Sequence, residues 1–238
     1  HPPRGRSSGE AFFVGPEGGA RCPGVLVLHS WWGLTDWTKD FATRLADEGY
    51  TVLAPDLFAS NTPSTPEEGE QLLSAVSPDE LSSLCMSSAR VLQAASKDPE
   101  APIAVIGFSM GASMALWLAA RLPDAIGAVV SFYGAQSIDF DEATARFQGH
   151  FAEDDHLVSE EDRVVTESFI RLGENQTEFH LYPGTRHWFF EPGDSYDPAA
   201  AELAWERTLD FLRRTIGQGR SRRSISPFPG LRRNGRVE

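Results

Sequence analysis

Short, continuous apolar runs alternate with amphipathic segments along most of the chain. The apolar runs have the composition of strands that are covered on both faces, and they lie at 24–28, 51–54, 103–107, 125–132, 145–151 and 177–181. A shorter run at 11–14 predicts a first strand at the sheet edge. Alternation of strand and helix is typical of a mostly parallel sheet with helices on both faces. We therefore expect an α/β fold with about seven to eight strands.

Capping and turn signals mark the predicted helices. Asp36 is expected to cap a helix that ends near Gly49 and whose inner face carries Trp37, Phe41 and Leu45. The tetrapeptide 77–80 has capping-box spacing with proline at the first helical position, and it predicts a helix to about residue 95. Residues 60–66 are rich in Ser, Thr, Asn and Pro. They predict a surface excursion over the carboxyl end of the sheet.

Two later helices are predicted in the same way. One begins after Ser159 and ends at Gly173, and its inner face carries Val165, Phe169 and Leu172. The other opens at Asp197-Pro198, and its inner face carries Trp205, Leu209, Leu212 and Ile216. Residues 152–158, before the first of these helices, predict an acidic loop.

Length and charge set the domain organisation and exclude some partners. We expect one α/β domain at 11–217, between a flexible lead-in at 1–10 and a basic, disordered tail at 218–238. The net charge is −13 although the tail holds six arginines and one acid, so the domain is strongly acidic. Because an acidic surface repels polyanions, we expect neither nucleic acid nor an anionic membrane as a partner. No apolar run approaches the roughly 18 residues of a membrane helix.

The two cysteines, Cys22 and Cys85, are too few for a disulfide framework in a chain of 238 residues, so we expect free thiols. Cys85 shares a helical face with Leu81, Leu84 and Leu92, which suits a buried thiol. The chain opens at His1 without a charged-then-apolar signal segment. We expect a cytoplasmic monomer or homodimer.

The strongest chemical signal is the segment 105–118, where an apolar β-branched run changes to helical spacing around Gly107-x-Ser109-x-Gly111. This pattern predicts a strained turn from strand to helix with Ser109 exposed at its tip. A side chain at either glycine would clash with neighbouring backbone. Ser109 is therefore a candidate nucleophile.

Ser109, the acidic loop and His187 follow three different strands, and the carboxyl ends of parallel strands meet at one edge of a sheet. Their chain order, serine then acid then histidine, is that of an α/β-hydrolase. In such a site the histidine takes the serine proton and the acid orients the imidazole. Glu153, Asp154 and Asp155 are all candidates for the acid. We favour Asp155, because an acid late in the loop can turn back toward the sheet edge.

Acyl transfer also needs N–H donors for the developing oxyanion. The N–H of Met110 is one candidate, and the second should come from the loop after 24–28, where we choose Trp31. Trp32 and Trp37 fit core or lid packing. Histidines and acids are close together at 150–156, but no cysteine or H-x-x-x-H spacing accompanies them, and we expect no metal and no cofactor.

With these residues placed, the chain resembles the dienelactone hydrolase family of α/β-hydrolases. The resemblance covers about residues 11–216, and the segments that carry it are 25–33, 49–58, 107–111, 132–134, 155–158 and 204–211. In that family a D-x-x-V pattern marks the catalytic acid, which implies Asp155. The resemblance also implies His187 as the base and Trp31 as the oxyanion donor.

The chain departs from that family around the predicted site. The resemblance implies a cysteine nucleophile and a glutamate that manages its thiol, at the positions of Ser109 and Ser30. It also implies two arginines that hold a substrate carboxylate. One would lie in the excursion before the helix that begins at 77–80, where this chain has no basic residue, and the other at the position of Glu191. We therefore expect a serine mechanism and a substrate other than dienelactone. The residues expected to line the substrate pocket are Ser30, Trp32, Tyr133, Trp188 and Glu191.

Together these patterns predict a serine hydrolase that cleaves small carboxylic esters or lactones through an acyl-enzyme. The acidic mouth and the aromatic loop favour a neutral or cationic, partly apolar substrate. Two alternatives stay open. An acyltransferase or perhydrolase would use the same triad. A catalytically silent hydrolase-like binding protein would usually have lost a triad member, whereas this chain has kept all three.

Overall fold

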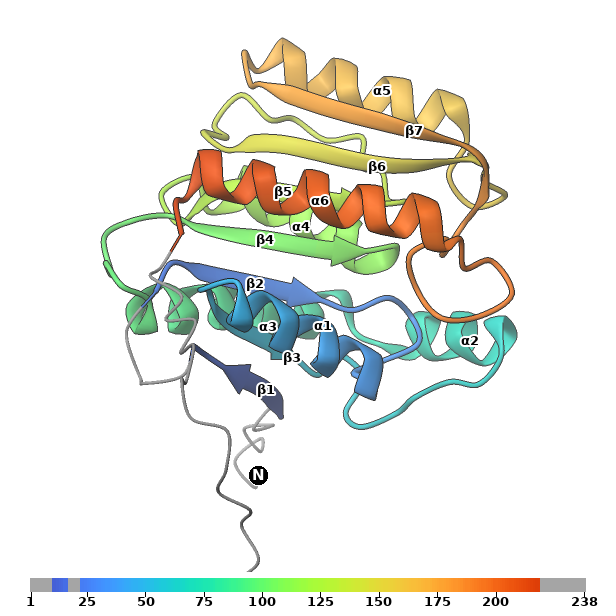
Figure 1. Cartoon of the computed structure of the whole chain (residues 1–238), viewed down its shortest axis with the longest axis horizontal. Helices are drawn as coiled ribbons and strands as arrows, with labels where there is room; N and C mark the ends of the chain where they lie inside the picture. Colours follow the sequence, from blue (N-terminus) through green and yellow to red (C-terminus); the bar gives the residue numbers. More distant parts are fainter. Residues whose placement is uncertain (1–9, 17–21, 219–238) are drawn as a thin grey trace, which may run out of the picture.

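A computed structural model of the chain describes residues 10–16 and 22–218. In this part of the chain seven strands form one sheet, in the order β1-β3-β2-β4-β5-β6-β7 (Figure 1). The strands are β1 (Ala11–Val14), β2 (Gly24–Leu28), β3 (Thr51–Pro55), β4 (Ile103–Phe108), β5 (Ile126–Phe132), β6 (Arg146–Asp154) and β7 (Thr177–Arg186). β1 runs antiparallel to β3, and the other neighbouring pairs are parallel. The predicted α/β fold is confirmed.

Six helices are present in the described chain, five between strands and one after the last strand. They are α1 (Asp36–Asp47), α2 (Pro66–Ala75), α3 (Pro78–Ala95), α4 (Met110–Arg121), α5 (Glu160–Leu172) and α6 (Pro198–Thr215). α1 and α6 cover one face of the sheet, and α3 and α4 cover the other (Figure 1). The lead-in at 1–9 and the tail at 219–238 lie outside the described residues.

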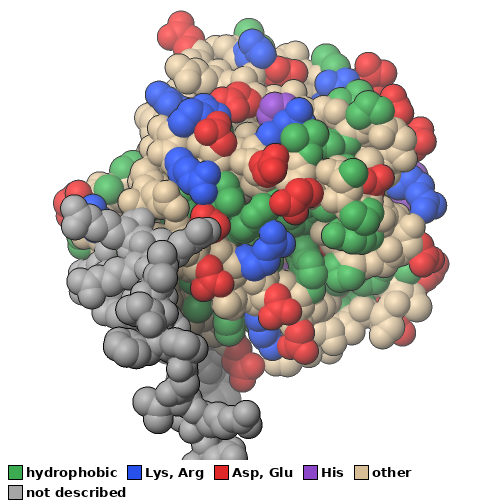
Figure 2. All heavy atoms as spheres, in the orientation of Figure 1, with side chains coloured by type: hydrophobic (Ala, Val, Ile, Leu, Met, Phe, Trp, Pro, Cys, Tyr) green, Lys and Arg blue, Asp and Glu red, His purple; other side chains and the backbone are tan. Residues whose placement is uncertain are grey.

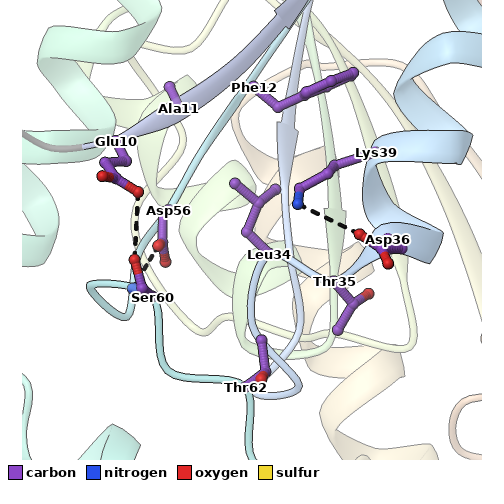
Figure 3. Close-up of a pocket in the computed structure, with 10 residues that line it drawn as sticks. All are labelled: Glu10, Ala11, Phe12, Leu34, Thr35, Asp36, Lys39, Asp56, Ser60 and Thr62. Carbon is purple, nitrogen blue, oxygen red and sulfur yellow. Dashed lines mark hydrogen bonds and ion pairs between the residues drawn. The ribbon is translucent and has the colours of Figure 1, made fainter.

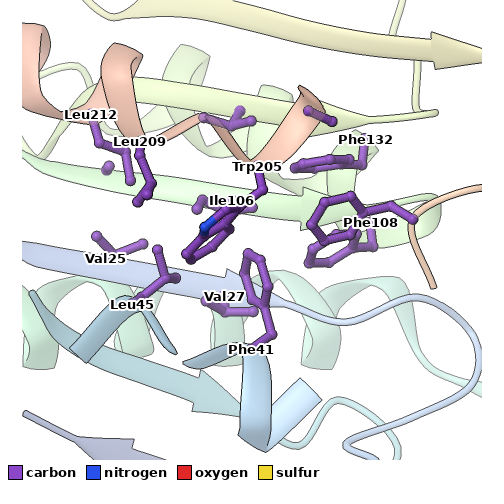
Figure 4. Packing of buried hydrophobic residues seen from close by; sticks show 14 of the residues in the cluster. Val25, Val27, Phe41, Leu45, Ile106, Phe108, Phe132, Trp205, Leu209 and Leu212 are labelled. Carbon is purple, nitrogen blue, oxygen red and sulfur yellow. The ribbon is translucent and has the colours of Figure 1, made fainter. Parts of the chain in front are cut away.

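Alternating side chains of the central strands supply two separate cores. In β2, Val25 and Val27 face α1 and α6, whereas Leu26 and Leu28 face α3 and α4. All five residues of β2 and all six of β4 are buried. Figure 4 shows the first core, where labelled side chains of the sheet meet those of α1 and α6: Phe41, Leu45, Trp205, Leu209 and Leu212. This double cover explains why the strands are continuous apolar runs.

Most predicted helix boundaries are confirmed by their caps. The side chains of Ser77, Ser159 and Asp197 accept hydrogen bonds from backbone N–H groups in the first turns of α3, α5 and α6. The predicted cap of α1 is off by one residue. Thr35 accepts from the N–H of Thr38, and Asp36 is already the first helical residue.

The sequence does not predict α2, because residues 60–66 indicate a surface excursion and no apolar period follows them. Its start carries a signal, since Thr65 accepts from the N–H of Glu68 and Pro66 occupies the first turn. Gly69 is the only buried residue of this helix. A Cβ at Gly69 would lie 2.8 Å from Cγ of Trp31, so this glycine allows α2 to pack against the indole.

β6 and β7 extend further than predicted. β6 continues through Glu153 and Asp154, so only the residues after Asp154 form the acidic loop. β7 runs through Pro183 and Gly184, which lie beyond the predicted end of this strand at Leu181. Proline has no backbone N–H to donate to a neighbouring strand. It is tolerated there because β7 is an edge strand, so one side of its backbone has no partner strand.

The predicted inner face of α5 is wrong. Thr166 and Ile170 are its buried residues, whereas Phe169 is 39% exposed and Leu172 is 74% exposed. α5 packs over the last strands of the sheet, so only a narrow strip of its surface is buried. This strip does not coincide with the apolar face that the sequence predicts.

Acidic and basic side chains are interspersed over α1 and α6 (Figure 2). Ion pairs join α6 to its neighbours on this face, with Arg213 bound to Glu48 and Arg214 bound to Glu178. Cys22 and Cys85 are both free, as expected, and both are buried. None of the helices in the described residues is long and apolar enough to cross a bilayer.

Candidate active site

Ser109 lies between the end of β4 and the start of α4, in a strained backbone conformation. Its φ of 52° and ψ of −114° fall outside the regions that serine normally adopts. A Cβ at Gly107 would collide with the carbonyl of Gly111, and a Cβ at Gly111 would collide with the carbonyl of Leu28. The two glycines therefore permit the tight turn that presents Ser109 at the carboxyl end of the sheet.

Ser109, His187 and Asp155 form a continuous hydrogen-bonded chain. Oγ of Ser109 lies 2.8 Å from Nε2 of His187. Nδ1 of His187 lies 2.8 Å and 2.7 Å from the two carboxylate oxygens of Asp155. A carboxylate accepts only, so Nδ1 carries the proton and Nε2 is left to accept from the serine hydroxyl. This is the tautomer that a general base for Ser109 requires.

The acid next to His187 is held from a second side by its own loop. Oδ1 of Asp155 accepts hydrogen bonds from the N–H groups of Leu157 and Val158, at 2.8 Å and 2.9 Å. The other two acids point elsewhere. Oε2 of Glu153 accepts from the N–H of Gly184, and Asp154 is an exposed residue at the end of β6. Of the three acids, only Asp155 contacts His187.

The two predicted oxyanion donors have unused N–H groups. Met110 is the first residue of α4, where no helical carbonyl is in reach of its N–H. Trp31 lies in the turn that Gly33 closes by donating to the carbonyl of Ser30 at 3.2 Å. Within the described chain, neither N–H donates to a protein acceptor.

A pocket of about 400 Å³ opens beside Ser109 and His187. Ser113, Gln136 and Ser137 supply hydroxyl and amide groups, and Leu157 and Val158 supply apolar surface. The full lining is Ser109, Met110, Ser113, Tyr133, Gly134, Ala135, Gln136, Ser137, Leu157, Val158, Asp162 and His187. Asp162 is its one carboxylate, and no Lys or Arg of the described chain lines it.

Only one of the five residues expected to line the substrate pocket does so. Tyr133 lines it, whereas Ser30 and Glu191 are buried behind the site, and Trp32 and Trp188 belong to an aromatic cluster beside it. Sequence patterns did not single out Gln136 or Asp162. The Ser159–Asp162 capping box could have indicated that Asp162 lies in the first turn of a helix, but not that it lines the pocket beside Ser109.

Glu191 lies four positions after His187 and is bonded to two hydroxyl groups. Its Oε1 accepts from Oγ of Ser30 at 2.6 Å, and its Oε2 accepts from the phenol of Tyr133 at 2.7 Å. Burial raises the pKa of Glu191 to about 7, although the two hydrogen bonds act in the opposite direction. Burial and the neighbouring carboxylate also raise the pKa of Tyr133 well above its usual range.

His29 is a neutral residue that fixes the backbone next to Ser30. Its Nε2 accepts from the N–H of Leu57 at 2.9 Å, so its Nδ1 carries the proton and donates to the carbonyl of Ser30 at 2.6 Å. Burial lowers the pKa of His29 to about 4, which outweighs the opposite effects of the Ser30 carbonyl and of Asp56. The 4.0 Å approach of Asp56 is therefore not an ion pair at neutral pH.

Trp31, Trp32 and Trp188 pack against one another, with ring centroids 5.3 to 6.0 Å apart. The ring of His156 lies 5.8 Å from Trp188 and 6.1 Å from His187. The ring of Trp188, whose centroid lies 4.7 Å from that of His187, therefore covers one side of this imidazole. The indole N–H groups of Trp31 and Trp188 are buried without a hydrogen-bond partner in the described chain.

A second groove of about 540 Å³ lies away from Ser109, between β1, α1 and the loop after β3 (Figure 3). Its polar side chains are paired with one another: Lys39 with Asp36 at 3.4 Å, and Ser60 with Glu10 at 3.3 Å. It contains none of the predicted catalytic residues. Among residues 10–16 and 22–218, no three His, Cys, Asp or Glu side chains are grouped as metal ligands.

Comparison with known proteins gives a family match along nearly the whole described chain. The model of the dienelactone hydrolase family matches residues 10–216. A carboxymethylenebutenolidase of Pseudomonas putida is 27% identical over 223 residues, which cover 84% of this chain and 89% of that one. Protein usf of Aquifex pyrophilus is also 27% identical, over 80% of this chain and 87% of its own.

A solved structure with a similar fold is a dienelactone hydrolase-like promiscuous phosphotriesterase from metagenomic libraries. It superposes with a TM-score of 0.73 and covers 88% of this chain and 99% of its own. The two sequences are 22% identical, so this likeness concerns the fold.

Proposed function

This chain belongs to the dienelactone hydrolase family, and we propose that it hydrolyses carboxylic esters or lactones through an acyl-enzyme on Ser109. The observation that carries this proposal is the hydrogen-bonded chain from Ser109 through His187 to Asp155, at 2.8 Å and 2.7 Å. A serine hydroxyl is a weak nucleophile until a base removes its proton, and this chain supplies the base and its orienting acid.

In the first step Oγ of Ser109 bonds to the substrate carbonyl carbon while its proton passes to Nε2 of His187. The carbonyl π electrons move to the oxygen, which becomes an oxyanion. The N–H groups of Met110 and Trp31 donate to this oxyanion, which is worth roughly 2.7–4 kcal/mol for each well-placed donor. Asp155 stabilises the imidazolium that forms on His187.

In the second step the tetrahedral intermediate collapses. The bond from carbon to the alkoxy oxygen breaks, and the leaving oxygen takes the proton from Nε2 of His187. A water then repeats both steps on the acyl-enzyme, with His187 as its base. The products are a carboxylic acid and an alcohol, or a single hydroxy acid from a lactone.

The lining of the pocket supports a neutral or cationic substrate rather than a carboxylate. Asp162 repels an anion, and no Lys or Arg of the described chain is present in the lining to bind one. Ser113, Gln136 and Ser137 suit an oxygenated acyl or alcohol group, while Leu157 and Val158 suit a short apolar chain. We propose that dienelactone, which carries a carboxylate, is a poor substrate.

We also place this enzyme in a reducing compartment such as the cytoplasm. The two cysteines support this proposal, since both are free and buried in different parts of the fold.

The test is hydrolysis of p-nitrophenyl acetate and butyrate by the wild type and Ser109→Ala. We expect the variant to lose at least roughly 10³-fold in kcat. Mass spectrometry of quenched wild-type enzyme should find an acyl group on the peptide that contains Ser109. Undiminished hydrolysis by Ser109→Ala would overturn the assignment of the nucleophile.

Two further measurements separate the alternatives that use the same residues. Ester or peracid formation that exceeds hydrolysis, with an added alcohol or peroxide, would indicate an acyltransferase or a perhydrolase. A wild type that a fluorophosphonate probe does not label would indicate a silent binding protein.

A further inference from the structure

Glu191 joins three loops at the carboxyl end of the sheet. It follows β7 and His187, while its partners Ser30 and Tyr133 follow β2 and β5. Glu191 is 4% exposed, Ser30 is 1% exposed and Tyr133 is fully buried. A carboxylate in such a place costs desolvation energy, so its two short hydrogen bonds need a structural account.

We propose that Glu191 is a positioning residue for the reaction at Ser109, which acts by fixing the peptide that carries the Trp31 N–H and the phenol ring that packs on His187. This inference rests on the proposed function, because it gives Glu191 a role in acyl transfer. It does not place Glu191 in contact with substrate.

The first effect concerns the peptide between Ser30 and Trp31. A peptide is planar and trans, so the direction of the Ser30 carbonyl fixes the opposite direction of the Trp31 N–H. That carbonyl accepts from His29 at 2.6 Å and from Gly33 at 3.2 Å. Glu191 holds the same residue by its hydroxyl at 2.6 Å. The proposed oxyanion donor is thus held from both sides of Ser30.

The second effect concerns Tyr133, whose backbone is strained. Its φ is 40°, and its N–H donates to the carbonyl of His150 at 2.7 Å. Its ring centroid lies 4.9 Å from that of His187 and 5.6 Å from that of Phe189. The bond from its phenol to Glu191 keeps this ring against the imidazole, where it also forms part of the pocket wall.

The chemistry of both partners favours a carboxylate at this position. Both are hydroxyl groups that donate, and an ionised carboxylate is a pure acceptor that satisfies both at once. A glutamine, or a protonated Glu191, presents a donor on one side. The hydroxyl on that side must then accept instead of donate, and its own proton loses its acceptor in a buried site, which weakens the hold on one of the two positioned groups.

Two groups act directly on this carboxylate, Ser30 after β2 and Tyr133 after β5. The charged or titratable groups next in line, Asp155 after β6 and His187 after β7, act on Tyr133. No ion pair of the described chain includes Glu191. Its pKa of about 7 therefore follows from burial, and its ionisation falls in the pH range in which a hydrolase is assayed.

The experiment compares the wild type, Glu191→Gln and the control Glu206→Gln, an exposed substitution on α6 that makes the same chemical change. We expect Glu191→Gln to lower kcat for p-nitrophenyl butyrate by at least about 10-fold, while KM stays within about twofold of the wild-type value. Removal of a whole oxyanion donor would lower kcat further, by roughly 10²–10³-fold. We expect Glu206→Gln to match the wild type. Wild-type kcat in Glu191→Gln would overturn the inference.

The pH profile distinguishes positioning from a purely structural role. In the wild type, protonation of Glu191 should lower kcat as the pH falls through about 7, because the protonated side chain no longer accepts from both hydroxyl groups. In Glu191→Gln this loss of kcat around pH 7 should be absent. An identical limb in both proteins would contradict the inference, even with a lowered kcat.

Ser30→Ala covers the case in which Glu191→Gln does not fold. We expect it to lower kcat by about 10-fold, since the Trp31 peptide is then held on one side only. Unchanged kcat in Ser30→Ala would overturn the role assigned to that bond. Activity retained in Ser109→Ala would instead refute the proposed function, so the two failures are distinguishable.

Discussion

Nδ1 of His187 lies 2.7 Å from Oδ2 of Asp155, and the two side chains are only 1% and 3% exposed. Solvent therefore does not compete for the imidazole proton, and the tautomer at His187 is set by this one carboxylate.

Asp155→Asn should lower kcat by about 10⁴-fold, because an amide can donate to Nδ1 and leave the wrong tautomer facing Ser109. The neighbouring Asp154→Asn makes the same change on an exposed residue of β6 and should match the wild type. Initial rates with p-nitrophenyl butyrate measure both. Equal losses in the two variants would show that the acid has been assigned to the wrong residue.

Asp162→Asn should raise kcat/KM for an anionic ester relative to a neutral one. The substitution keeps an acceptor for the N–H and hydroxyl of Ser159 but removes the one carboxylate of the pocket lining. The p-nitrophenyl monoester of glutarate and p-nitrophenyl butyrate are suitable substrates, and we expect their ratio to shift by roughly threefold. Glu161→Gln on the same helix, outside the lining, should leave this ratio unchanged.

Gly69→Ala should destabilise the protein, although alanine in a helix usually stabilises by about 1 kcal/mol relative to glycine. The new Cβ would lie 2.8 Å from Cγ of Trp31, and this overlap should cost about 1–3 kcal/mol. It should also lower kcat, because Trp31 carries the proposed oxyanion donor. Ser74→Ala on the exposed side of α2 is the control, and thermal unfolding with parallel rate measurements checks both effects. A Gly69→Ala variant as stable as the wild type would show that α2 can shift away from the indole.

The free energy of unfolding should decrease as the pH rises, because Glu191 must ionise in a buried site. Its folded-state pKa of about 7 lies above its ordinary value of 4.5, so the native state binds the proton more tightly than the unfolded state. The stabilising contribution is fully present below about pH 4.5 and is lost as the pH rises through about 7. Relative to Glu191→Gln, the free energy of unfolding should fall by about 3 kcal/mol over this range. Urea titrations of both proteins at pH 4.5, 6 and 8 measure the difference, and a constant difference would contradict it.

The sheet and the elbow could be predicted because their causes are local. Strands covered on both faces must be apolar throughout, as in β2 and β4, and the tight turn at Ser109 excludes side chains at Gly107 and Gly111. The order of serine, acid and histidine followed from the positions of three strands.

The rest depends on contacts between distant segments. Ser30 and Glu191 are 161 positions apart, so no local pattern indicates that they share a hydrogen bond. α2 buries only Gly69 and has no apolar period to detect, and β7 tolerates Pro183 only because it lies at the edge. The pocket lining combines residues after β5 with the first turn of α5, which only the folded chain brings together.

The edge position of β7 means that the proposed nucleophile and its base lie in regions of unequal local stability. β4, which leads to Ser109, is buried along all six residues, whereas β7, which leads to His187, buries two of its ten. Amide hydrogen exchange should therefore be fast in β7 and slow in β4. Local opening of this edge would separate His187 from Ser109 while the central sheet stays folded. Heat should then inactivate the enzyme at a lower temperature than it melts the protein, and a residual-activity assay would report on β7 rather than on the whole fold.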